Sequence, residues 1–138
     1  MSEARPKQFV AVFDFGAQYG QLIARRVRDL HVYSEIVPCD ISADELAAMA
    51  PSAIILSGGP ASVYAEGAPD MDARVFELGI PILGFCYGEQ IMAVKLGGEV
   101  AHTDKGEYGP ATLTRLGSSV LLDGTPEGGQ TVWMSHRD

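Results

Sequence analysis

The chain has 138 residues, of which 46% are hydrophobic and 20% charged, a composition typical of one soluble globular domain. Its formal net charge of −8 argues against a nucleic-acid-binding surface, because phosphate contacts require a basic footprint. No apolar stretch approaches the roughly 18 residues of a membrane helix, and the polar N-terminus lacks an apolar signal core. With two cysteines, Cys39 and Cys86, in neither disulfide nor metal spacing, we expect a cytoplasmic protein without a metal site.

Strand-like and helix-like segments alternate over the first hundred residues. Short apolar runs ended by turn residues predict strands at Phe9–Phe13, Val32–Val37, Ala53–Leu56 and Ile82–Phe85. Amphipathic or capped segments predict helices at Gln21–Leu30, after Ser42, at Asp70–Leu78 and at Gly88–Leu96. This alternation predicts an α/β fold, with a mostly parallel sheet covered by helices on both faces.

The pattern changes after Gly98. Short strands are expected at Glu99–His102, Ala111–Leu116, Val120–Leu122 and Thr131–Met134, and no helix is expected there. The chain stops directly after an apolar run, at 135–138, and we therefore expect a truncated domain or a short relative of a longer protein.

The centre of the sequence is the stretch Gly84–Gly88, in which Cys86 lies between an apolar strand and a helix. Hydrolase nucleophile elbows have the same plan, with small residues flanking a nucleophile at the tip of a sharp turn. A cysteine there is strongly nucleophilic, and the helix N-terminus behind it favours the thiolate. The backbone N–H of Tyr87 would be one donor to a developing oxyanion. The pattern leaves a second interpretation open, in which Cys86 is a buried structural cysteine.

A second loop, Ser57–Pro60, follows the end of another predicted strand. Its two glycines would let the backbone approach a ligand, and the Gly59 N–H would be a second oxyanion donor. The alternative is a loop that only reverses the chain. The Lys-Ser/Thr ending of a phosphate-binding loop is absent.

A cysteine nucleophile needs a base, and the sequence contains three histidines. His31 falls at a helix end and His102 before a polar turn, so a solvated position is the simpler interpretation of both. His136 follows a predicted strand and stands in a His-x-Asp sequence, which superficially suggests a base with its orienting carboxylate.

Four stretches together resemble the class I (triad) glutamine amidotransferases: Asp14–Tyr19 with Gln21–Arg28, Leu56–Tyr64, Gly84–Gly88 with Gln90, and Val132–His136. Because Gln18 and Tyr19 lead into an arginine-rich helix, the sequence is similar in particular to the glutaminase domain of GMP synthetases. The resemblance implies a flavodoxin-like α/β fold and spans nearly the whole chain from Phe9.

The resemblance also implies a reaction. Cys86 would attack the side-chain amide of glutamine, form a glutamyl thioester and release ammonia, with the Gly59 and Tyr87 N–H groups as the oxyanion hole. The residues that it assigns to glutamine binding are Gln90, Ser135 and His136. In the family the ammonia goes to a synthetase (ATP-pyrophosphatase) domain or subunit, which uses ATP and magnesium to convert XMP to GMP. No cofactor is implied for the glutaminase domain itself, and a homodimer through the absent part is expected.

Three features depart from the family. Its catalytic His and Glu belong to a segment beyond Ser135–His136, so residues 1–138 would be a domain truncated before that segment, without the ATP-pyrophosphatase domain and inactive alone. Glu89 replaces an apolar residue in the elbow and would oppose the thiolate, and Arg137 replaces a glycine. Two alternatives follow: a degenerate, non-catalytic binding or regulatory module, or the glutaminase of another amidotransferase, such as one for anthranilate or carbamoyl phosphate synthesis.

Overall fold

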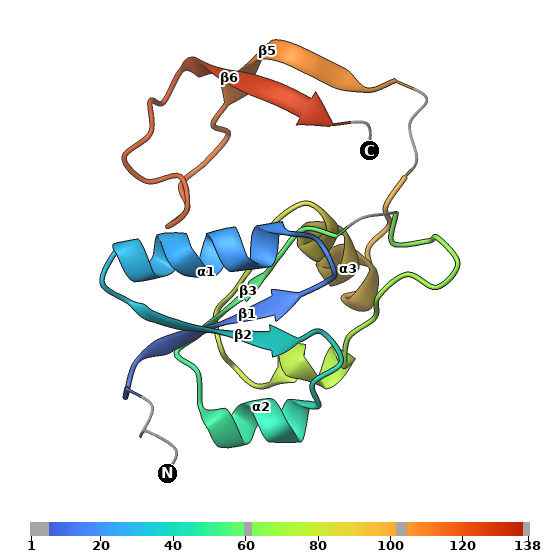
Figure 1. Cartoon of the computed structure of the whole chain (residues 1–138). Helices are drawn as coiled ribbons and strands as arrows, with labels where there is room; N and C mark the ends of the chain where they lie inside the picture. The colour runs from blue at the N-terminus through green and yellow to red at the C-terminus, as the bar shows by residue number, and fades with distance from the viewer. Residues whose placement is uncertain (1–5, 60–61, 102–104, 137–138) are drawn as a thin grey trace. The chain divides into compact units, whose positions relative to one another are not determined.

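The computed structural model describes residues 6–59, 62–101 and 105–136. The chain divides into two compact units, residues 1–100 and 101–138. In the described part of the first unit, four strands form one sheet in the order β2-β1-β3-β4, and every neighbouring pair is parallel (Figure 1). The strands are β1 (Phe9–Asp14), β2 (Tyr33–Pro38), β3 (Ala53–Leu56) and β4 (Ile82–Gly84). The predicted parallel α/β fold is therefore confirmed.

Helices cover both faces of this sheet. The helical elements are α1 (Tyr19–Asp29), α2 (Ala43–Met49), the 3-10 helix η1 (Ala73–Glu77) and α3 (Tyr87–Lys95). The connection from β1 to β2 runs across the sheet in the opposite direction to those from β2 to β3 and from β3 to β4. Right-handed crossovers therefore place α1 on one face and α2 with η1 on the other, as Figure 1 shows for α1 and α2.

The core of the first unit explains why the strand predictions succeeded. The central strands β1 and β3 lie between two helical layers, so their side chains are apolar on both faces. Phe13 and Leu56 are fully buried and pair in register near the carboxyl ends of these strands. None of the helices in the described residues has the length and apolar composition needed to cross a bilayer.

The helix predicted at 70–78 is wrong in length and type, because the structure has only the short 3-10 helix η1 there. Two aspartates explain the difference. Asp70 accepts a hydrogen bond from the Met71 N–H at 2.8 Å, and Asp72 accepts one from the Arg74 N–H at 3.0 Å. Side chains that satisfy nearby backbone N–H groups in this way compete with helix formation.

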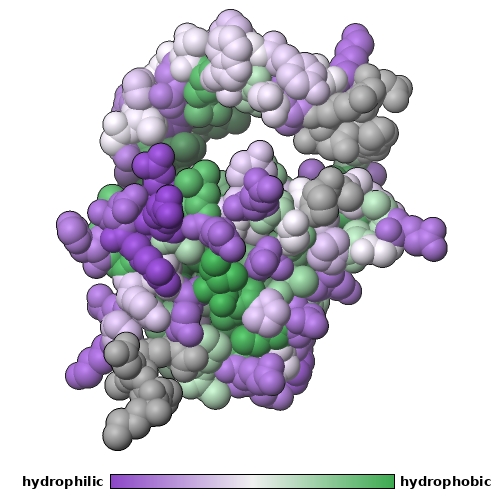
Figure 2. All heavy atoms as spheres, viewed as in Figure 1, coloured by the Kyte–Doolittle hydropathy of each residue, from purple (hydrophilic) through white to green (hydrophobic). Residues whose placement is uncertain are grey.

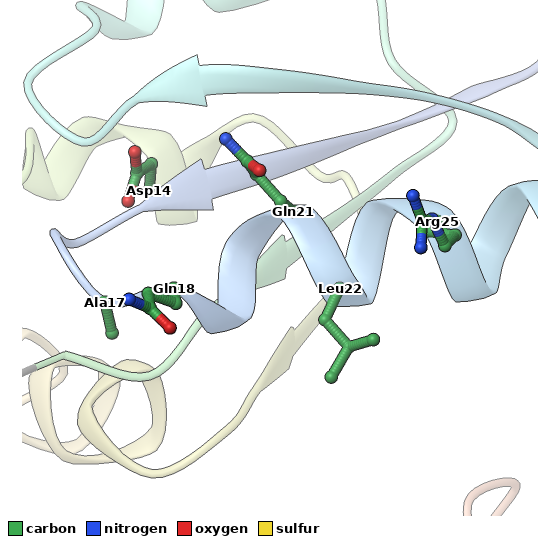
Figure 3. Close-up of a pocket in the computed structure, with 6 residues that line it drawn as sticks. All are labelled: Asp14, Ala17, Gln18, Gln21, Leu22 and Arg25. Carbon is green, nitrogen blue, oxygen red and sulfur yellow. The ribbon is translucent and has the colours of Figure 1, made fainter.

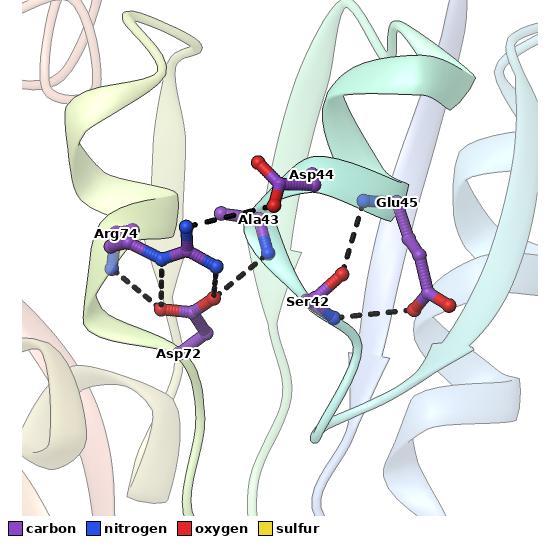
Figure 4. A network of polar contacts seen from close by, with 6 residues as sticks. All are labelled: Ser42, Ala43, Asp44, Glu45, Asp72 and Arg74. Atoms are coloured by element: carbon purple, nitrogen blue, oxygen red, sulfur yellow. Dashed lines mark hydrogen bonds and ion pairs between the residues drawn. The ribbon is translucent and has the colours of Figure 1, made fainter.

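The carboxylate of Asp72 also joins η1 to α2 (Figure 4). It accepts a hydrogen bond from the Ala43 N–H at 2.9 Å and pairs with the Arg74 guanidinium at 3.0 Å. The predicted cap of α2 is confirmed beside it, since Ser42 accepts from the Glu45 N–H at 3.1 Å. One carboxylate therefore satisfies the start of two helical elements.

We expect Asp72 to make the stability of the protein depend on pH. The hydrogen bonds from Arg74, with those from the Ala43 and Arg74 backbone, lower the pKa of Asp72 to about 2. Because the pKa of Asp72 is lower in the folded than in the unfolded protein, its ionised carboxylate stabilises the fold. This stabilisation is complete above about pH 4 and is lost as the pH falls toward 2. Asp72→Asn should therefore lower the urea midpoint at pH 6, and the difference from the wild type should shrink toward pH 2.

The matched control for this prediction is Glu66→Gln. Glu66 is exposed and has no ion-pair or hydrogen-bond partner among the residues that the structure describes. Its substitution should leave the urea midpoint nearly unchanged at every pH. If the difference in urea midpoint between wild type and Asp72→Asn stays constant from pH 6 to pH 2, the ionised carboxylate of Asp72 is not the source of the stabilisation.

The second unit is an antiparallel hairpin of β5 (Glu107–Thr114) and β6 (Gly129–His136), with Pro110 opposite Trp133. The strand predicted at 131–134 is confirmed with longer bounds, and the one predicted at 111–116 is confirmed over 111–114 as part of β5, which begins at Glu107 and ends at Thr114. The strand predicted at Val120–Leu122 is wrong, because this segment is a turn in which the Leu122 and Asp123 N–H groups bond the Ser119 carbonyl. Residues 99–101 are not a strand either, and His102 lies outside the described residues.

Candidate active site

Cys86 lies at the tip of the turn between β4 and α3 and is the N-cap residue of α3. Its side chain is exposed, so the interpretation as a buried structural cysteine is wrong. Its backbone has φ 50° and ψ −113°, a conformation that costs a residue with a side chain on the order of 1–3 kcal/mol. Such strain at an exposed cysteine is what a nucleophile elbow predicts.

The two glycines that flank Cys86 let β4 and α3 approach one another. A methyl group on Gly84 would lie 2.8 Å from the backbone N of Glu89, and one on Gly88 would overlap the carbonyl group of Leu56. The Leu56 carbonyl also accepts a hydrogen bond from the Phe85 N–H at 2.9 Å. The elbow is therefore braced against the end of β3, and the spacing of the glycines has a steric reason.

The loop after β3, which contains Ser57, Gly58 and Gly59, lies beside the turn that carries Cys86. The buried hydroxyl of Ser57 donates to the Phe13 carbonyl at 2.6 Å, which fixes the loop to the end of β1. A methyl group on Gly59 would lie 2.7 Å from Cγ of Tyr87, and one on Gly58 would lie 3.8 Å from Cβ of Cys86. The glycine pair therefore lies beside the elbow.

The oxyanion role of Gly59 and Tyr87 stays a prediction, but their placement is compatible with it. Tyr87 is the first residue of α3, and the N–H at such a position has no acceptor within the helix. The Gly59 backbone packs against the ring of the same tyrosine. Both peptide units therefore lie next to the residue that carries the thiol.

A cavity of about 210 Å³ opens beside Cys86. Its lining combines α1 with the two loops and consists of Tyr19, Leu22, Ile23, Gly58, Phe85 and Cys86. Apart from the thiol and the Tyr19 phenol, no titratable side chain of the described residues of the first unit lines it. His31 is exposed at the end of α1 and does not line this cavity, and His136 belongs to the second unit.

Gln90 carries a polar atom that has no partner. It lies in α3, where its N–H donates to the Cys86 carbonyl at 3.1 Å. Its side-chain Oε1 is buried and accepts no hydrogen bond from the protein in the part of the chain that the structure describes. An unsatisfied buried acceptor is costly, so this oxygen marks a place that lacks a hydrogen-bond donor.

The other predicted glutamine-binding residues, Ser135 and His136, lie at the end of β6 in the second unit. His136 Nε2 is 3.0 Å from a carboxylate oxygen of Glu107 on the opposite strand. Their predicted role stays a prediction, and Arg137 lies outside the described residues. Among the described residues no group of three or more His, Cys, Asp or Glu side chains is placed to hold a metal ion.

A second, polar cavity of about 480 Å³ lies along α1 (Figure 3). It is lined by Asp14 at the end of β1 and by residues of α1 and its N-terminal turn, namely Ala17, Gln18, Gln21, Leu22 and Arg25. The strongest hydrophilic colouring in Figure 2 lies over α1, where Arg25, Arg26 and Arg28 are exposed. Sequence reasoning missed this cavity, although Gln18, Gln21 and Arg25 have the spacing of one helix face.

Comparisons with known proteins agree with this geometry. The family model described as glutamine amidotransferase class-I matches residues 11–138. GMP synthase (glutamine-hydrolyzing) of Thermobifida fusca is 57% identical over 129 residues, covering 94% of this chain and 24% of the relative. The same enzyme of Streptomyces avermitilis is 58% identical over 131 residues, covering 94% of this chain and 25% of the relative.

The fold has a solved counterpart. A crystal structure of a protein from Thermoplasma acidophilum, described as one subunit of a GMP synthase, aligns with a TM-score of 0.77 and 29% identity, covering 97% of this chain and 67% of that one. The chain spans about a quarter of the length of the curated relatives it matches. Since the family model covers nearly the whole chain, this protein belongs to the class I glutamine amidotransferase family.

Proposed function

We propose that this chain is the glutaminase part of a GMP synthase and that Cys86 is its nucleophile. The observation that carries the proposal is the exposed thiol on a strained turn, with the Gly59 and Tyr87 peptide units beside it. The relatives described as glutamine-hydrolyzing GMP synthases support the choice of glutamine and of this enzyme over other amidotransferases.

The chemistry follows from these groups. The Cys86 thiolate attacks the carboxamide carbon of glutamine, and the carbonyl oxygen becomes an oxyanion that accepts from the Gly59 and Tyr87 N–H groups. The carbon–nitrogen bond then breaks, the nitrogen leaves as ammonia after taking a proton, and a glutamyl thioester remains. Water hydrolyses the thioester to glutamate and restores the thiol. The buried Oε1 of Gln90 is the acceptor for an N–H of the bound amino acid.

Ammonia made at Cys86 would serve a synthetase domain or subunit, in which ATP and magnesium act on XMP. The length of the relatives supports this part of the proposal, because this chain corresponds to only about a quarter of each GMP synthase. Among the described residues of the first unit no histidine lines the cavity at the thiol, so the direct test concerns reaction at Cys86 and not turnover.

The test is labelling with the chloromethyl ketone analogue of glutamine, in which a carbon–sulfur bond forms and chloride leaves. We expect one adduct, on Cys86, and we expect glutamine to slow its formation. Cys39 is the internal control, because burial, together with the nearby Asp40 carboxylate, raises the pKa of its thiol. Cys39→Ser should label like the wild type, and Cys86→Ala should not label.

Other outcomes separate the alternatives. Modification of Cys39 with Cys86 untouched would contradict the proposed nucleophile. Glutamine binding in calorimetry without any labelling of Cys86 would identify a non-catalytic binding module instead. Copurification with a synthetase for another acceptor would leave the glutaminase in place and change the enzyme to which it belongs.

A further inference from the structure

The side chain of Tyr87 does more than accompany its backbone N–H. It is 2% exposed, and its ring packs between Phe15, at a centroid distance of 5.2 Å, and the Gly59 backbone. Its hydroxyl donates to the carbonyl of Pro69, in the segment that precedes η1. One side chain therefore touches the glycine loop, the core and the 62–70 segment.

The bond to Pro69 bridges a region that is not closely packed. A cavity of about 300 Å³ lies between the 62–70 segment and α3, and Tyr87 and Lys95 are among its lining residues. Across it the segment is held to α3 by polar contacts, which are the Tyr87–Pro69 hydrogen bond and the Lys95–Asp70 ion pair at 2.7 Å. Where apolar packing is incomplete, such contacts determine where the ring can lie.

Burial and the Asp70 carboxylate raise the pKa of Tyr87, so its phenol stays protonated at neutral pH and remains a donor to Pro69. The ion pair is the weaker support, because the Asp70 side chain is 71% exposed and screened by solvent. The hydroxyl is therefore the main link between the 62–70 segment and the start of α3.

We propose that the Tyr87 hydroxyl is a positioning group, which holds the tyrosine ring against Gly59 and so fixes the two peptide N–H groups beside Cys86. This inference rests on the proposed glutaminase function. It assigns the side chain a task separate from that of the Tyr87 N–H. If the ring shifts, the Gly59 N–H loses its alignment with the oxygen of a substrate attacked by Cys86.

The experiment compares Tyr87→Phe, which removes only the hydroxyl, with the wild type in two alkylations of Cys86. The chloromethyl ketone analogue of glutamine places a carbonyl oxygen where the oxyanion would form, whereas iodoacetamide reacts by direct displacement and needs no oxyanion hole. For the ketone we expect the maximal inactivation rate to fall about tenfold, with its half-saturating concentration unchanged. The iodoacetamide rate should stay within about twofold of the wild type.

Tyr33→Phe is the matched control, because Tyr33 lies on β2 and is half exposed, and this variant should behave like the wild type with both reagents. Lys95→Met is a second variant that loosens the same segment and leaves Tyr87 intact. It should lower the ketone rate alone, by about two- to threefold. If Tyr87→Phe fails to fold, an unchanged ketone rate in Lys95→Met overturns the inference that the 62–70 segment holds the ring in place.

Equal losses with both reagents would show that the hydroxyl only stabilises the fold, and a loss below about twofold with the ketone would also overturn the inference. A wild-type protein that the ketone does not label at Cys86 would overturn the proposed function, and this inference with it. Labelling of the wild type without an effect of either variant would overturn the inference alone.

Discussion

Gly88→Ala is expected to destabilise the protein by about 3 kcal/mol, a large fraction of the free energy of unfolding of a typical domain. The added methyl group would overlap the carbonyl group of Leu56, which belongs to the central strand β3. The methyl group would be attached directly to the backbone of α3, and the carbonyl group belongs to the backbone of β3, so no rotation of a side chain relieves the overlap. Either α3 must move away from the sheet or β3 must distort, and both changes disrupt the buried core.

Gly20→Ala is the matched control, since Gly20 is also a buried glycine near the start of a helix that packs on the sheet. A methyl group there would meet Ser57 Oγ at 3.8 Å and Asp14 Oδ1 at 3.9 Å, which are ordinary contacts. Alanine also favours helix by about 1 kcal/mol over glycine, so this variant should be as stable as the wild type or slightly more stable. Urea midpoints of the three proteins measure the contrast, and equal midpoints for Gly88→Ala and wild type would refute the steric explanation of the elbow.

The contrast between these glycines shows what the sequence could and could not predict. The apolar runs identified β1 and β3 because strands of a buried parallel sheet are apolar on both faces. The spacing of Gly84 and Gly88 predicted a tight strand-to-helix turn. The helix expected at 70–78 failed because Asp70 and Asp72 bond their own neighbourhood, which periodicity does not reveal.

The candidate site was predictable in part for a similar reason. Cys86 could be identified because its motif is local in sequence. Contacts between distant segments were not predictable from any pattern, including the packing of Gly59 against the Tyr87 ring and the bond of that tyrosine to Pro69. The unsatisfied Oε1 of Gln90 likewise depends on what surrounds it in three dimensions.

The strained backbone at Cys86 leads to a second prediction, in which glycine at this position raises the stability but removes the reactive thiol. Cys86→Gly should be more stable than Cys86→Ala by about 1 kcal/mol. At φ 50° and ψ −113° a side chain is strained, whereas glycine adopts this conformation freely. The relief of strain, about 1–3 kcal/mol, is partly offset because glycine is more flexible in the unfolded chain. This entropic cost is about 0.5–1 kcal/mol, so the relief of strain is the larger effect.

Both variants lack the thiol, so neither should react with the chloromethyl ketone analogue of glutamine, and the comparison isolates the backbone. Ala47→Gly is the control for the residue change, because this exposed position inside α2 should lose about 1 kcal/mol when it becomes glycine. An alanine-to-glycine change would thus stabilise the protein at position 86 and destabilise it at position 47, which only the local conformation explains. If Cys86→Gly unfolds at lower urea than Cys86→Ala, the turn is not strained. A more stable but inert Cys86→Gly protein would show instead that the conformation at position 86 is costly for a residue with a side chain.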